Sequence, residues 1–93
     1  MYRPLREELE IKNSKVHGQG VFSKQKIIAG YDLGNTHIYR NKEIHRTPLG
    51  GFLNHSDTPN CFIIDNAAES VLYTVRPINK GEELTVYYRK YDV

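Results

Sequence analysis

This 93-residue sequence contains a single cysteine, Cys61, and no tryptophan. One cysteine excludes a disulfide within the chain and argues against a cysteine-rich zinc site. The four histidines are not arranged at metal-ligand spacing, so we predict no metal. No run approaches the ~20 apolar residues of a membrane span, and the N-terminus lacks the apolar core of a signal peptide. These absences predict a cytoplasmic protein that does not bind a membrane.

An excess of one charge is also lacking, because 13 Lys and Arg are offset by 11 Asp and Glu to give a net charge of +2. Nucleic-acid binding usually requires a concentrated basic face, so we predict no nucleic-acid partner. Hydrophobic content of 39% with 26% charged residues is typical of a globular protein. A chain of this size forms one small domain with a thin core, burying about 60–65% of its unfolded surface.

Short strand signals dominate the sequence. Apolar residues alternate with polar ones, or form brief β-branched runs, around residues 9–11, 21–22, 27–28, 31–33, 36–39, 62–64, 70–76 and 84–88. Residues 65–67 form a turn between two of these runs, which therefore predict a β-hairpin. Gly34 and Asn35 form a second predicted turn, between the two strands on either side of them.

Helical signals are limited to two places. Residues 4–9 are compatible with a single turn, and residues 49–53 with a short 3₁₀ piece. With so little helix and so many tight turns, the sequence predicts a mostly β fold.

Residues 51–61, GFLNHSDTPNC, place the amide of Asn54 directly before the imidazole of His55. Both side chains can donate and accept hydrogen bonds, and such groups need partners when they are buried. An Asx-type turn with a solvated histidine would satisfy them, and so would a bound ligand. Cys61, at the start of an apolar strand, is interpreted as a small buried hydrophobe rather than a nucleophile.

Two further segments bear on this choice, and they read VHGQGVF at residues 16–22 and GEELTVYY at residues 81–88. Gly18 and Gly20 allow close approach of a ligand to the backbone, although an ordinary turn explains an isolated pair of glycines equally well. In their order along the chain, the three segments resemble the signatures of SET domains, from about residue 9 to residue 88. SET domains are the fold of protein-lysine methyltransferases that use S-adenosylmethionine.

The resemblance implies a β-clip fold of short strands in small curved sheets, with a C-terminal pseudoknot through which the Asn54 segment threads. It also implies that S-adenosylmethionine is bound by His17, Gly18, Gln19 and Gly20 together with Asn54 and His55. Methyl transfer needs a neutral lysine amine held about 3–3.5 Å from the methyl carbon, so positioning and electrostatics carry most of the catalysis.

Tyr88 matches the family tyrosine whose hydroxyl faces the transfer site, and the resemblance makes it the candidate catalytic residue. A phenol there would steer the amine and stabilise the polarised methyl group. Read from its strand alone, Tyr88 is equally an inward core residue beside Leu84 and Val86. We interpret Glu82 and Glu83 as a solvated acidic turn rather than a catalytic pair.

The sequence departs from the family in four places. Only about residues 40–49 are available for the insert that helps to bind substrate, and the sequence ends five residues after Tyr88, which predicts no post-SET zinc element. Thr36 and Ile63 stand near positions where tyrosines often line the lysine channel. Family members usually have an aspartate directly before the tyrosine that matches Tyr88, and here that position is Tyr87. Fewer aromatic walls would hold an alkylammonium less tightly.

These observations predict a single SET domain over residues 1–93 that methylates the ε-amine of a protein lysine. A homodimer is plausible, because a second copy could complete a thin core and an incomplete channel. Two other hypotheses stay open. One is a cofactor- or partner-binding module on the same fold that does not turn over, and the other is a purely structural β-clip protein.

Overall fold

A computed structural model describes residues 5–87 and shows a mostly β protein with two four-stranded sheets and one short helix. The predicted fold class is therefore confirmed. The first sheet has the order β1-β2-β8-β5, and its strands are β1 (Leu9–Asn13), β2 (Gln19–Ser23), β8 (Glu83–Val86) and β5 (Asn54–His55). The pair β5–β8 is parallel, and the other pairs in this sheet are antiparallel.

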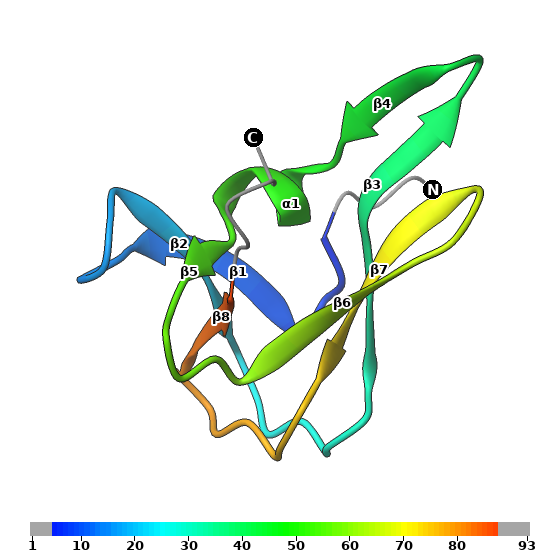
Figure 1. Ribbon diagram of the computed structural model, residues 1–93. Coiled ribbons are helices and arrows are strands. Elements are labelled where there is room, and N and C mark those ends of the chain that lie inside the picture. Colours follow the sequence, from blue (N-terminus) through cyan, green and yellow to red (C-terminus); the bar gives the residue numbers. More distant parts are fainter. Residues whose placement is uncertain (1–4, 88–93) are drawn as a thin grey trace.

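The second sheet has the order β4-β3-β7-β6 and is antiparallel throughout. Its strands are β3 (Asp32–Arg40), β4 (Glu43–Arg46), β6 (Cys61–Asp65) and β7 (Glu69–Thr74). The predicted hairpin is β6–β7, and its turn lies where the sequence placed it (Figure 1).

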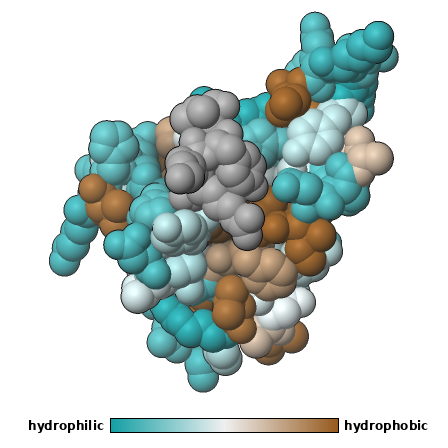
Figure 2. Space-filling model, in the orientation of Figure 1, coloured by the Kyte–Doolittle hydropathy of each residue, from teal (hydrophilic) through white to brown (hydrophobic). Residues whose placement is uncertain are grey.

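The core lies between the two sheets and draws on nearly every element. Its buried apolar residues are Leu9, Val21, Ile27, Leu33, Leu49, Leu53, Cys61, Leu72, Ile78, Leu84 and Val86. Strand alternation explains the contribution of β6, because Cys61 faces inward while Phe62 and Ile64 remain 41% and 48% exposed. In β7, Ser70, Val71 and Leu72 are all buried, because this strand lies between β3 and β6. In Figure 2 apolar atoms accordingly gather over this hairpin.

The helix α1 (Pro48–Phe52) is a single α-helical turn, where the sequence predicted a 3₁₀ piece over residues 49–53. Thr47 caps it by accepting a hydrogen bond from the Gly50 amide (3.3 Å) and donating one to the Asn35 carbonyl (2.6 Å). Proline at the first helical position has the φ angle that a helix requires. Within residues 5–87, α1 is the only helix, and its five residues are too few to span a bilayer.

The predicted turn at Gly34 and Asn35 is wrong, because β3 runs continuously through both residues. Gly34 has a φ of +105°, and the pairing of β3 with β7 shifts register on either side of it. The glycine therefore forms a bulge inside a strand instead of a turn between two strands.

The short insert is a β-hairpin formed by β3 and β4, and it projects from the body of the protein (Figure 1). Asn41 and Lys42 at its tip have φ angles of 52° and 65°, as a two-residue type I′ turn requires. All four residues of β4 are exposed. The sequence did not predict this strand, because its alternation is weak.

Two other predicted strands differ from the structure. The strand at Ile27 and Ile28 is reduced to an isolated bridge between Ile27 and Ile78. The last strand, β8, is buried at Leu84, Thr85 and Val86 alike, because it lies between β2 and β5 instead of at an edge. The predicted end of that strand, Tyr88, lies outside the described residues.

Candidate functional site

Asn54 joins two segments that are far apart in the sequence. It lies in β5 opposite Thr85 of β8. Its side-chain nitrogen donates toward the backbone carbonyls of His17 and Gln19, each at 3.2 Å, and toward Oε2 of Glu83 at 2.8 Å. The glycine-containing loop, the Asn-His segment and the start of β8 therefore meet at one amide group.

Glu83 receives a second donor from the other end of the same loop. The hydroxyl of Ser14 lies 2.8 Å from Oε1 and 2.9 Å from Oε2 of Glu83. The interpretation of Glu83 as part of a solvated acidic turn is wrong, because its carboxylate is partly buried against these donors. Neither Ser14 nor Glu83 was predicted as a site residue, and spacing alone could not have paired them across 69 positions.

The two glycines of the loop serve different purposes. Gly18 has a φ of +48°, and a β-carbon there would meet nothing within 4 Å. A β-carbon at Gly20 would lie 2.1 Å from Oε2 of Glu83 and 3.0 Å from Nδ2 of Asn54. Gly18 therefore leaves open space beside the backbone, whereas the space beside Gly20 is occupied by the Glu83 side chain, which would have to move to admit a side chain at position 20.

The side chain of His55 points away from the Asn54 contacts. Its Nε2 atom lies 3.1 Å from Oδ1 of Asp57, and its ring centroid lies 4.9 Å from that of Tyr87. His17 contributes its backbone carbonyl to the cluster while its side chain is exposed. Of the predicted cofactor residues, the structure thus brings His17, Gln19 and Gly20 into one cluster with Asn54, and places His55 next to it in β5.

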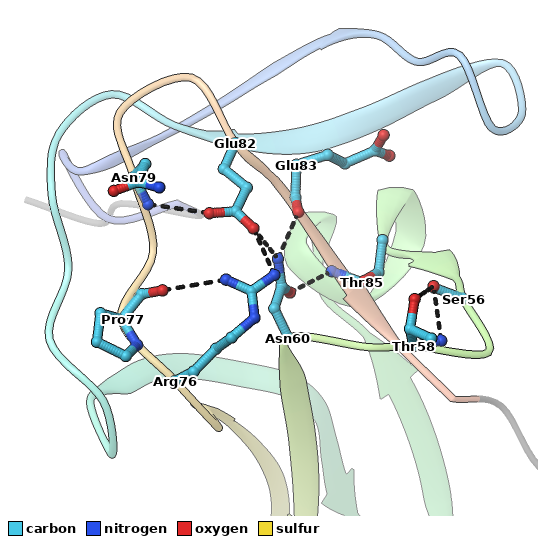
Figure 3. A network of polar contacts seen from close by, with 9 residues as sticks. All are labelled: Ser56, Thr58, Asn60, Arg76, Pro77, Asn79, Glu82, Glu83 and Thr85. Atoms are coloured by element: carbon cyan, nitrogen blue, oxygen red, sulfur yellow. Dashed lines mark hydrogen bonds and ion pairs between the residues drawn. The ribbon is translucent and has the colours of Figure 1, made fainter.

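Asn60 holds β8 in place from the other side (Figure 3). It is 3% exposed, donates to the Glu83 carbonyl at 2.8 Å and accepts from the Thr85 amide at 2.9 Å. Its own carbonyl accepts from the Val75 amide at 2.8 Å. One buried amide therefore ties the end of the Asn-His segment to β8 and to the chain that follows β7.

Glu82 is also engaged, so its interpretation as solvated is wrong as well. Arg76 donates to its carboxylate at 2.6 Å, and the Asn79 amide does so at 3.0 Å, with Asn60 contributing a longer bond of 3.3 Å (Figure 3). The hydrogen bond from Arg76, more than any other contact, holds the pKa of Glu82 below its ordinary value. This network closes the turn that leads into β8.

The interpretation of Cys61 as a buried hydrophobe is confirmed. It is 1% exposed, and burial raises the pKa of its thiol to about 12. Thr36, near a position expected to line the lysine channel, is fully buried, with its hydroxyl 3.0 Å from Nδ1 of His37 and 3.4 Å from the Ser70 carbonyl. Ile63 packs against the core. Tyr88, the predicted catalytic residue, lies outside the described residues.

No group of three or more metal-ligating side chains occurs within residues 5–87. The cluster around Asn54 instead presents oxygen atoms: two backbone carbonyls and one carboxylate. Such an arrangement suits hydrogen-bond donors and positive charge in a ligand.

Comparison with known proteins identifies the family. The model of the SET domain matches residues 32–89, more than half of the chain. The H3 lysine-4 specific histone-lysine N-methyltransferase of Emericella nidulans is 32% identical over 91 residues, covering 87% of this chain and 8% of that protein. Human histone-lysine N-methyltransferase SMYD3 is 39% identical over 59 residues, covering 58% of this chain and 14% of that protein. The chain thus spans a small fraction of the length of these relatives.

Solved structures agree on the fold. A Plasmodium falciparum protein superposes with a TM-score of 0.75 at 20% identity, covering 92% of this chain and 96% of the other. The methyltransferase domain of human PR domain-containing protein 2 superposes with a TM-score of 0.73 at 21% identity, covering 96% of this chain and 82% of the other. With a matching family model, a related methyltransferase sequence and this shared architecture, the chain belongs to the SET domain family, whose related members include histone-lysine methyltransferases.

Proposed function

We propose that this protein is an S-adenosylmethionine-dependent protein-lysine N-methyltransferase. The observation that carries the proposal is the position of Asn54, whose amide joins the glycine-containing loop to β8. The three motifs of the sequence are thereby gathered at one place, as a shared ligand site would require. Tyr88, which follows β8 closely in the chain, remains the proposed catalytic residue.

The residues present fit the cofactor electrostatically. Asn54 and Ser14 together direct three donor hydrogens at two backbone carbonyls and one carboxylate, and these oxygens have more lone pairs than three hydrogens can occupy. The carboxylate of Glu83 adds a negative charge. A ligand that carries both an ammonium and a sulfonium group complements such a surface. We propose that the loop from His17 to Gly20, with Asn54 and His55, binds S-adenosylmethionine.

When bound, S-adenosylmethionine would supply a methyl group on a positively charged sulfur. The role of the protein would be to align a lysine amine with that methyl group and to favour the neutral amine. We assign the orientation of the amine to the hydroxyl of Tyr88. Threading of the Asn54 segment into a pseudoknot is part of the same proposal, and the parallel pairing of β5 with β8 supports it.

The substrate that we propose is a lysine of a protein. The Emericella nidulans relative carries the name of an H3 lysine-4 specific enzyme, so a histone H3 peptide is a rational first substrate to test. A second candidate function, a SET module that binds cofactor or a partner without turnover, is favoured by Thr36. Because this side chain is small and fully buried, it would not supply the aromatic wall that a tyrosine near this position often gives the lysine channel.

Calorimetric titration with S-adenosylmethionine tests the cofactor site. We expect saturable binding to the wild-type protein and at least a ~10-fold loss with Asn54→Ala, since its hydrogen bonds hold the site together. Asn66→Ala is the matched control, because Asn66 caps the exposed β6–β7 turn. Absence of binding to the wild type at millimolar ligand would contradict the proposed function.

Turnover distinguishes the two candidates. With radiolabelled S-adenosylmethionine and an H3 peptide, an enzyme should transfer label, and Tyr88→Phe should abolish most of it while leaving cofactor affinity unchanged. Tyr39→Phe serves as the control. The Tyr39 hydroxyl bonds to Ser70, and both residues lie in the second sheet, away from the Asn54 cluster in the first. Cofactor binding without transfer to any protein substrate would support the binding module instead.

We also propose that a second copy of the chain completes the lysine channel, and that the protein acts in the cytoplasm. Light scattering tests the first point, because full activity at a monomeric mass would exclude a required dimer. Imaging of a tagged protein in its own cell tests the second.

A further inference from the structure

We infer that Ser14 and Glu83 are positioning residues that hold the 14–20 loop in the shape needed to bind the cofactor. This inference rests on the proposed function. We call the hydrogen-bonded contact between the Ser14 hydroxyl and the Glu83 carboxylate the Ser14–Glu83 latch. These residues would act on the ligand through the loop and not through the chemistry of methyl transfer.

Ser14 controls both ends of the loop. Its backbone amide donates to the Gly18 carbonyl at 2.8 Å, which closes the loop. Its hydroxyl oxygen accepts from the Val16 amide at 2.9 Å, while its hydroxyl proton is directed at Glu83. A single serine therefore organises the loop from within and attaches it to the sheet.

Glu83 is a firm anchor for this contact. It pairs with Phe22 across the sheet, and its carbonyl accepts from the buried Asn60 amide at 2.8 Å. Residues 15–19, in contrast, are exposed and have no core contacts of their own. Beyond the pairing of β1 with β2 at its base, the order of the loop therefore comes from its side-chain tethers, which are Ser14 at one point and Asn54 at the other.

The carboxylate of Glu83 makes both of its contacts charge-assisted hydrogen bonds. Glu83 accepts from Ser14 and from Asn54 at the same time, and only an ionised carboxylate offers two oxygens and no competing donor. In Glu83→Gln, one oxygen is replaced by an NH₂ group and the charge is removed. The carbonyl of the new side chain can still accept from Asn54, and its NH₂ group can donate to the Ser14 hydroxyl oxygen, but both bonds are then neutral and weaker than those to a carboxylate.

Losing the latch should weaken binding by lowering the population of the competent loop. The apparent dissociation constant rises in inverse proportion to that population. A hydrogen bond to a charged group typically corresponds to about 10- to 100-fold in an equilibrium constant. We therefore expect S-adenosylmethionine affinity to fall about 10-fold or more in Ser14→Ala. Ser14→Thr keeps the hydroxyl and should remain within about 3-fold of wild type.

Two measurements on the full chain test the inference. The first is the calorimetric dissociation constant of S-adenosylmethionine for wild type, Ser14→Ala, Ser14→Thr and Glu83→Gln. The second is amide hydrogen exchange of residue 14 without ligand. That amide donates to Gly18 in every variant, so its protection reports loop closure without itself losing a partner. Faster exchange and weaker binding in Ser14→Ala and Glu83→Gln, both restored in Ser14→Thr, are the expected results.

The outcome separates the latch from the function on which it rests. If the wild type does not bind S-adenosylmethionine, the proposed function fails, and exchange at residue 14 decides whether the latch exists. Unchanged exchange in Ser14→Ala overturns the latch in any case. Unchanged affinity in Ser14→Ala, when the wild type binds, overturns its role in cofactor binding. A urea unfolding midpoint shared by all four proteins would confirm that neither result reflects global destabilisation.

Discussion

Oε2 of Glu83 lies 2.1 Å from the point that a β-carbon on Gly20 would occupy. The carboxylate that contacts Asn54 and Ser14 occupies the space that a side chain at position 20 would need. Two motifs separated by some sixty residues are therefore coupled sterically as well as by hydrogen bonds. The shape of the glycine-containing loop and the start of β8 depend on each other, and variants at either position should affect the same site.

The glycines of the loop provide a test of this coupling. In Gly20→Ala, the new methyl group should displace the Glu83 side chain and shift the side-chain amide resonances of Asn54 in NMR spectra. In Gly18→Ala, the methyl group meets nothing, and we expect only the ~1–2 kcal/mol cost of a left-handed φ. Unmoved Asn54 resonances in Gly20→Ala would contradict the packing described here.

Helix α1 offers a sharper pair of substitutions. A β-carbon at Gly50 would lie 2.3 Å from the Thr36 carbonyl oxygen, which is backbone and cannot rotate away. Gly50→Ala should therefore destabilise the protein by about 1–3 kcal/mol in urea unfolding. Gly51→Ala should be neutral or stabilising by up to about 1 kcal/mol, because its β-carbon has only an ordinary contact at 3.8 Å. Equal costs at both positions would refute this account of α1 packing.

Removal of the Asn60 side chain should cost far more stability than removal of the Asn66 side chain. Asn60→Ala leaves the buried Thr85 amide without its acceptor, and we expect a loss of about 3 kcal/mol in the free energy of unfolding. Asn66→Ala removes an amide that also accepts two backbone bonds, but in an exposed turn, so about 1 kcal/mol or less is expected. Similar midpoints for the two variants would show that burial at Asn60 contributes little.

Glu82 makes stability depend on pH on the acidic side. Its pKa is lowered in the folded protein, chiefly by Arg76, so its contribution is fully present above the unfolded pKa of about 4.3. That contribution is lost as the pH falls further through the folded pKa. Urea unfolding between pH 7 and pH 3 should therefore show a shallower decline for Glu82→Gln than for wild type. Glu8, whose pKa the Tyr31 hydroxyl lowers, should preserve part of the decline. Identical slopes would contradict the role of Glu82.

Cys61 should act as a reporter of unfolding. Because its thiol is buried and its pKa is raised to about 12, it should react with a disulfide reagent at pH 8 only when the chain opens. The labelling rate should rise with urea in proportion to the unfolded fraction. Rapid labelling of the native protein would contradict the burial of this residue.

Much of the architecture follows from local patterns in the sequence. The β6–β7 hairpin was predictable because alternation and a turn signal agree, and the burial of Cys61 followed from its place in that strand. Motif order along the chain was sufficient to identify the family and to select Asn54 and His55. These features depend on residues close together in the sequence, where side-chain period and turn chemistry decide the structure.

Contacts between distant segments were decided by tertiary structure alone. No local pattern indicates that Ser14 and Asn54 share the carboxylate of Glu83, or that Gly20 must leave room for it. Gly34 has the same chemistry in a turn as in a bulge, and pairing with β7 selected the bulge. The physical reason is the same in each case. A hydrogen bond or a steric contact depends on distance in space, and the folded sheets bring together groups that the chain keeps far apart.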